Sequence, residues 1–258
     1  MDTSATKCAL LKSLAKYPLC RFFLEGCVQG LTAEVIEADL NAEPEFSVLQ
    51  HFSRSEQMER LETLFSRSLE ILGIPKEELQ DSLEFNLKSY DIRNFESTRG
   101  LLRFIVRLPS LGYSRIRILT GKGLADLEFY SERQRWFAEV KTPTLQYGVR
   151  EGLTVDKHQP ESCNIAEYVD NVTRFLADGR VSRARKHLCS TREQLGPAET
   201  MIGIVLNWLA AGFFLEIAHI NDIYESLRGR RPNWEHDYLQ DIDCMAFLID
   251  DKLTRICN

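Results

Sequence analysis

Three short segments with the residue pattern of β-strands lie close together in the middle of this 258-residue chain. They are expected over 114–120, 124–130 and 135–142. A Gly121-Lys122-Gly123 turn separates the first two, and a four-residue polar turn separates the last two. Spacing this tight predicts a strand that leads directly into a β-hairpin, and this restricts the folds open to the chain more than any other feature.

Helical periodicity dominates the chain up to about residue 92. Apolar residues recur at spacings of three and four over 58–72. Gly73 and Pro75 then separate this helix from a second one, expected from Lys76 to about residue 90, because glycine ends helices readily and proline fits a first turn. We therefore expect a helical N-terminal region over 1–92, in which no motif indicates a chemistry.

The remainder of the chain mixes helices with strands. A helix is expected over 94–109, before the strand-like segments, and another from Ile165 to a cap at Gly179, after them. Two apolar segments complete the expected strands, 201–206 and 243–249. This order predicts an α/β (α+β) fold over 93–258, in which helices flank a central mixed sheet.

The composition, 44% hydrophobic and 27% charged, is that of an ordinary globular protein. The seven cysteines form no Cys-x-x-Cys pair, so we expect reduced thiols. Because the N-terminal segment has no apolar core of signal-peptide type, we expect a cytoplasmic protein, nucleoid-associated if bacterial.

One apolar stretch, 201–220, has the length of a membrane span, but Asn207, Glu216 and His219 make its insertion costly. A buried strand is the expected alternative, and no membrane partner is expected.

Charge is distributed unevenly along the chain. The net charge is -6, yet residues 99–150 carry 10 Lys and Arg against 4 Asp and Glu. Such a basic segment can form a phosphate-facing surface, and we select Arg99, Arg103 and Lys122 as nucleic-acid contacts. The same charges could instead pair with the acidic segments on either side, and the sequence leaves both possibilities open.

The residues of the hairpin predict a metal site. Asp126 is in its first strand, and Glu139, Val140 and Lys141 are in its second. Because side chains alternate along a strand, Glu139 and Lys141 point to one face and Val140 to the other, and normal pairing can bring Asp126 alongside. Two carboxylates suit Mg²⁺, with Mn²⁺ as a substitute, and the lysine beside them supplies a water-activating group. A metal ion and a water-activating group together are what phosphodiester hydrolysis requires.

These residues resemble the signature of the PD-(D/E)XK nuclease superfamily, which has the restriction-endonuclease-like fold. The similar segments are Leu124-Ala125-Asp126 and the run Phe137-Ala138-Glu139-Val140-Lys141-Thr142. The order of elements over 94–206 is also similar: a helix, a three-stranded meander, a helix and a strand. Glu96 is at the place where some members carry an acid, whereas Ala125 replaces the proline that gives the family its name.

The resemblance implies roles for individual residues. Asp126 and Glu139 would be metal ligands, with the backbone carbonyl of Val140 as a third. Lys141 would orient the attacking water and stabilise charge on the phosphate, and Glu96 would be a further acid of the catalytic site. The implied function is that of a Mg²⁺-dependent endonuclease that hydrolyses phosphodiester bonds in DNA, and a homodimer would suit enzymes of this type.

Two alternatives remain open. The first is a non-catalytic nucleic-acid-binding or assembly module on the same fold, and the second is a helical interaction protein in which the hairpin is decoration. Nucleotide hydrolysis and serine or cysteine hydrolysis lack their motifs. The histidines have no partner at metal-ligand spacing and are expected to be hydrogen-bonded internally or solvent-facing: His51, His158, His187, His219 and His236.

Overall fold

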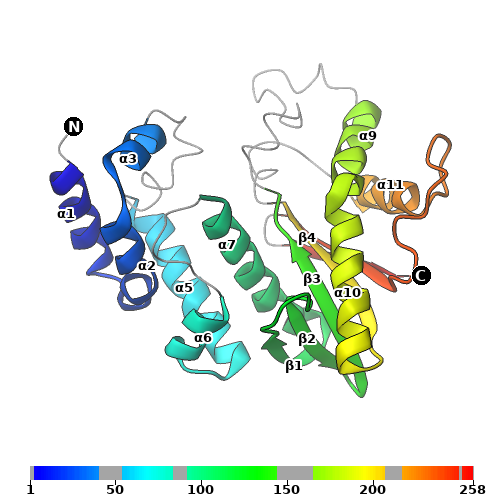
Figure 1. Cartoon of the computed structure of the whole chain (residues 1–258), viewed down its shortest axis with the longest axis horizontal. Coiled ribbons are helices and arrows are strands. Elements are labelled where there is room, and N and C mark those ends of the chain that lie inside the picture. The colour runs from blue at the N-terminus through cyan, green and yellow to red at the C-terminus, as the bar shows by residue number, and fades with distance from the viewer. Residues whose placement is uncertain are drawn as a thin grey trace. The chain divides into compact units, whose positions relative to one another are not determined.

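The structure is a computed structural model that describes residues 3–40, 54–83, 92–143, 165–206, 217–249 and 252–257 (Figure 1). The chain forms two compact units, Met1–Val106 and Arg107–Asn258. The division falls at the C-terminal end of α7 (Ile92–Arg107), and the predicted boundary between residues 92 and 93 lies at the start of this helix.

The described elements of the first unit are helices. They are α1 (Thr3–Leu14), α2 (Pro18–Gly30), α3 (Ala33–Leu40), α5 (Ser55–Leu72), α6 (Lys76–Ser82) and α7. Helices α2 and α5 pack through the stacked rings of Phe23 and Phe65, whose centroids are 4.3 Å apart. The Glu62 carboxylate on α5 accepts hydrogen bonds from the N–H groups of Leu19 and Cys20, at 3.0 and 2.8 Å, where an anion suits the N-terminus of α2. As predicted, α5 ends at Gly73, which has a left-handed φ of 65°. The helix predicted from Lys76 to about residue 90 begins at Lys76 as expected, but the prediction of its length is wrong, because α6 ends at Ser82.

The second unit contains a six-stranded mixed sheet in the order β1-β2-β3-β4-β5-β6. After a short 3₁₀ turn (Leu108–Leu111) come β1 (Tyr113–Ile118), β2 (Leu127–Ser131), β3 (Gln134–Lys141), β4 (Glu199–Leu206), β5 (Cys244–Ile249) and β6 (Lys252–Cys257). The first three strands pair antiparallel, β4 and β5 join in parallel, and β6 returns antiparallel. The predicted α/β class with a mixed sheet is thereby confirmed, and an all-helical protein is excluded.

Helices connect the parallel strands. Between β3 and β4 the chain forms α9 (Ile165–Leu176), a π-helical turn (Ala177–Val181) and α10 (Ser182–Leu195), and α11 (Ile217–Leu227) lies between β4 and β5. Figure 1 shows α9 and α10 as one long rod beside β3. The prediction that a helix ends at Gly179 is wrong. Gly179 has a φ of 82° within the π-helical turn, and the buried side chains of Ala177, Val181 and Ala184 continue the apolar face across it.

One hydrophobic core of this unit lies between a face of the sheet and these helices. It includes Phe137, Val172, Leu188, Ile202, Ile223 and Phe247. β4 is buried along nearly its whole length, which explains why its sequence is a continuous apolar run. No helix in the described part of the chain is long and apolar enough to cross a membrane, and the first six residues of the stretch 201–220 belong to β4.

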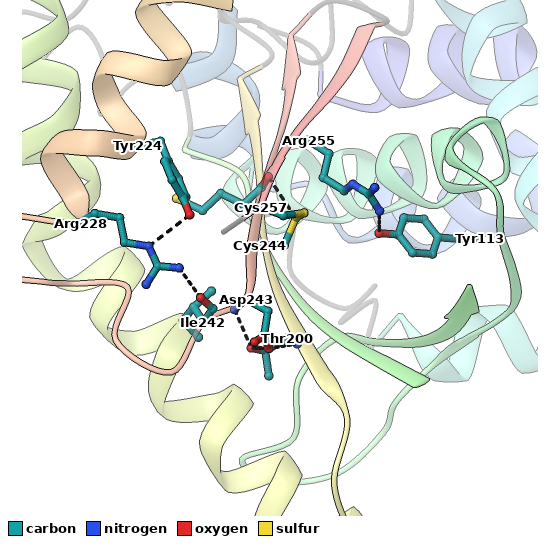
Figure 2. Close-up of a disulfide and its surroundings, with 10 residues drawn as sticks. Tyr113, Thr200, Tyr224, Arg228, Ile242, Asp243, Cys244, Arg255 and Cys257 are labelled. Atoms are coloured by element: carbon teal, nitrogen blue, oxygen red, sulfur yellow. Dashed lines mark hydrogen bonds between the residues drawn. A yellow bond between two sulfur atoms is a disulfide. The ribbon is translucent and has the colours of Figure 1, made fainter. Parts of the chain in front are cut away.

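Cys244 and Cys257 lie opposite each other on β5 and β6 and form a disulfide (Figure 2). The prediction that all cysteines are reduced is therefore wrong for this pair, and Cys163 lies outside the described residues. Figure 2 also shows the Arg228 guanidinium, which donates to Tyr224 Oη and to the Ile242 carbonyl and so ties the loop before β5 to α11. On the other side of the disulfide, Arg255 donates to Tyr113 Oη at 2.5 Å.

Candidate active site

The hairpin pairs so that its two acids meet. Leu127 of β2 is opposite Ala138 of β3, which places Asp126, one residue before β2, at the level of Glu139. The Asp126 Oδ2 atom accepts a hydrogen bond from the Val140 N–H at 2.6 Å. Asp126 is therefore held directly against β3, and the predicted convergence of the two carboxylate segments is present in the structure.

Glu139 is buried, with 1% of its surface exposed, and its two carboxylate oxygens differ in their surroundings. Oε1 lies 2.5 Å from Lys141 Nζ and 2.8 Å from His187 Nδ1. Oε2 is buried as well, but no donor among the described residues hydrogen-bonds to it. A buried carboxylate oxygen without a donor costs free energy, and a bound cation would compensate this atom.

The second acid is held in an unfavourable electrostatic environment. The pKa of Asp126 is raised from its ordinary 3.8 to about 7, first by burial and second by the charge of Glu139. The Lys141 ammonium and the Val140 N–H act against this shift. Two carboxylates whose charges oppose each other in a buried place are stabilised when a divalent cation binds between them.

Helix α10 contributes two residues that sequence reasoning did not select. His187 contacts Glu139, and one turn later Thr191 Oγ1 accepts a hydrogen bond from the Ala125 N–H at 2.6 Å. The Thr191 hydroxyl also donates to the His187 carbonyl at 2.7 Å. The only signal in the sequence is the four-residue spacing of His187 and Thr191 on a helix that follows the hairpin. His51 and His158 lie outside the described residues.

The other predicted site residues lie on α7 and in the turn between β1 and β2. Glu96, Arg99 and Arg103 are half-buried on α7, in the first unit, and their roles stay predictions. Burial lowers the pKa of the Arg99 guanidinium, whose Nε atom has no acceptor within the described ranges. Lys122 is exposed in the turn between β1 and β2, as a phosphate contact requires.

Part of the basic segment serves the fold. The buried Glu128 carboxylate pairs with Arg117 and, at 2.7 Å, with Arg135. Although burial alone would raise it, the hydrogen bonds from Arg135, Arg117 and Tyr130 lower the pKa of Glu128 overall. Arg135 also donates to the Leu195 carbonyl at the end of α10, at 2.7 Å. For these two arginines, internal pairing is the observed role.

The hairpin offers few side-chain ligands for a metal ion. Within the ranges that the structure describes, no group of three or more His, Cys, Asp and Glu side chains could hold a metal. A centre at the hairpin would depend on the two carboxylates of Asp126 and Glu139 together with a backbone carbonyl and water. Oxygen donors of this kind fit Mg²⁺, which keeps several waters and takes only one or two protein carboxylates. The uncompensated Glu139 Oε2 atom supports this fit.

Comparison of the chain with protein-family models, with curated proteins and with solved structures gives no significant match.

Proposed function

We propose that this protein is a Mg²⁺-dependent endonuclease with a restriction-endonuclease-like core, which hydrolyses phosphodiester bonds in DNA. The order of the described elements supports this core, because α7 precedes an antiparallel β1-β2-β3 meander, and α9 and α10 then lead to β4, parallel to β3. This is the element order of the PD-(D/E)XK superfamily that the hairpin residues resemble.

The observation that carries the proposal is the uneven environment of the Glu139 carboxylate. Lys141 and His187 both hydrogen-bond to Oε1, whereas Oε2 is buried without a donor in the described residues, beside a second acid with a raised pKa. A carboxylate that served only the fold would be expected to have donors at both oxygens. Asp126, Glu139 and the Val140 carbonyl would hold the ion. Bound there, Mg²⁺ would polarise the scissile phosphate and lower the pKa of a coordinated water.

Lys141 is the group on this chain suited to the developing charge. Its Nζ atom lies 2.5 Å from Glu139 Oε1, and 23% of its side chain is exposed to solvent. A cation at this position can donate a hydrogen bond to the attacking water and stabilise negative charge on the phosphate. Lys122, exposed in the β1–β2 turn, is proposed to contact the DNA backbone without reading its sequence. The homodimer and the cytoplasmic location stay predictions.

Cleavage of a supercoiled plasmid and of a short DNA duplex tests the function. Wild type, Asp126→Asn and Lys141→Ala would be compared in Mg²⁺, in Mn²⁺ and in EDTA, with Lys252→Ala, an exposed residue of β6, as the matched control. We expect wild type and Lys252→Ala to cut only with a divalent ion, and both site variants to lose about 100-fold or more in rate.

Two results would overturn the proposal. Equal cleavage by all four proteins would show that the hairpin residues are not the site. Binding of the duplex in a gel-shift assay without cleavage in either metal would establish a nucleic-acid-binding module instead.

A further inference from the structure

Helix α10 is attached to both segments that carry the hairpin acids. Its His187 Nδ1 atom lies 2.8 Å from Glu139 Oε1, across 48 positions of the chain. Its Thr191 Oγ1 atom lies 2.6 Å from the Ala125 nitrogen, across 66 positions, and Ala125 directly precedes Asp126. Residues four apart lie on one side of a helix, so a single face of α10 contacts both segments.

We propose that His187 and Thr191 are positioning residues, which orient the carboxylates of Glu139 and Asp126 toward one divalent cation. This inference rests on the proposed metal-dependent function. It adds to that function a pair of residues on α10 that act through the ligands and do not touch the substrate.

The His187 contact fixes the orientation of the Glu139 carboxylate. With a carboxylate as partner, Nδ1–H is the donor, and it approaches the same oxygen as the Lys141 ammonium. Two donors from different elements, β3 and α10, hold Oε1 and restrict rotation about the last side-chain bond. Oε2 is therefore directed away from both donors, which leaves it free to bind a cation.

The Thr191 contact fixes the backbone that leads into Asp126. Thr191 and Ala125 are both buried, with 0% and 1% exposed. The Thr191 hydroxyl donates to the His187 carbonyl, so its oxygen lone pairs are left to face the Ala125 N–H. Asp126 is in turn tied to β3 through the Val140 N–H. The acid is thus held between α10 on one side and β3 on the other.

Hydrogen bonds that orient metal ligands have a known scale of effect. Loss of such a partner commonly weakens metal affinity or activity by about 10- to 100-fold. Conservative variants can separate this role from simple packing. Asn at position 187 places an amide nitrogen near the position of Nδ1, and Ser at 191 keeps the hydroxyl, whereas Ala at 187 and Val at 191 remove the hydrogen-bonding group.

Mn²⁺ binding to the full-length protein, measured by electron paramagnetic resonance, tests the inference. His187→Ala and Thr191→Val would be compared with His187→Asn and Thr191→Ser, and with His236→Ala, an exposed histidine of the same unit, as the control. We expect about 10- to 100-fold weaker Mn²⁺ binding for the first two variants. The conservative variants and the control should bind within a few-fold of wild type. In cleavage assays the loss should fall on kcat, with KM for the duplex nearly unchanged.

The outcomes separate the two proposals. If wild type binds Mn²⁺ and all five variants bind it equally well, the positioning role is wrong and the metal site stands. If His187→Asn and Thr191→Ser lose affinity as fully as His187→Ala and Thr191→Val, the effect comes from packing and the inference is again wrong. If wild type itself binds no Mn²⁺ at millimolar concentration, the metal-dependent function fails, and this inference with it.

Discussion

The Nδ1 atom of His187 lies 2.8 Å from Oε1 of Glu139, so a helix that follows the hairpin reaches back to the carboxylate of its last strand. Lys141 donates a hydrogen bond to the same oxygen, and Oε2 has no donor in the described part of the chain. The buried Glu139 carboxylate therefore has one hydrogen-bonded oxygen, Oε1, and one oxygen without a donor in the described residues, Oε2. Beside it, Asp126 is held in a setting that disfavours its charge.

The Asp126→Asn substitution should stabilise the protein at neutral pH in the absence of divalent ions. The folded state raises the pKa of Asp126 from 3.8 to about 7, so it binds this proton more tightly than the unfolded chain. The stability that the Asp126 proton contributes is therefore fully present in acid and is lost as pH rises between these two pKa values. Asn can still accept from the Val140 N–H. Urea unfolding in EDTA should show a gain on the order of 1 kcal/mol at pH 8 and none near pH 4. A variant less stable than wild type at pH 8 would contradict this.

Magnesium should stabilise wild type and not this variant. A ligand that binds only the folded state adds free energy according to its concentration, about 1.4 kcal/mol at ten times its dissociation constant. Thermal unfolding with increasing Mg²⁺ should therefore raise the Tm of wild type and leave that of Asp126→Asn nearly constant. Equal shifts in both proteins would show that the ion binds elsewhere. Lys252→Ala, which keeps both acids, is expected to follow wild type.

Glu128→Gln should destabilise the second unit. The buried carboxylate has lost its hydration and is compensated by Arg117 and Arg135, so its removal leaves two cations without their partner. We expect a loss of about 1 to 3 kcal/mol at pH 7, measured by urea unfolding. Because the pKa of Glu128 is lowered in the fold, wild type loses this contribution as pH falls, and the difference should shrink in acid. Glu132→Gln, exposed in the β2–β3 turn, should behave as wild type.

Removal of the disulfide should weaken the edge of the sheet. Cys244 and Cys257 are separated by 13 positions, and a crosslink that closes a loop of this size contributes about 2 to 3 kcal/mol. Cys257→Ser should lower the free energy of unfolding by this amount, and reduction of wild type by dithiothreitol should match it. Cys8→Ser, at an exposed free thiol, is the control. Identical stability of reduced and oxidised wild type would contradict the prediction.

The sequence could predict those features whose causes are local. The hairpin follows from alternation and from two short polar turns, and its register brings Asp126 against Val140, 14 positions later in the chain. The roles of His187 and Thr191 could not be predicted, because they depend on how α10 packs on β3. Strand β6 has a mixed burial pattern and gives little periodic signal. The Cys244–Cys257 pairing requires the register of β6 on β5, so the sequence predicts neither this pairing nor that strand.

We propose that a divalent cation binds between Asp126 and Glu139 at the Glu139 Oε2 atom. Anomalous diffraction from crystals of the full-length protein grown with Mn²⁺ tests it most directly. We expect a peak within about 2.5 Å of Oε2 and of an Asp126 carboxylate oxygen, with Oε1 still bonded to Lys141 and His187. A structure in which Asp126 donates a hydrogen bond to Oε2, with manganese absent or bound elsewhere, would contradict it.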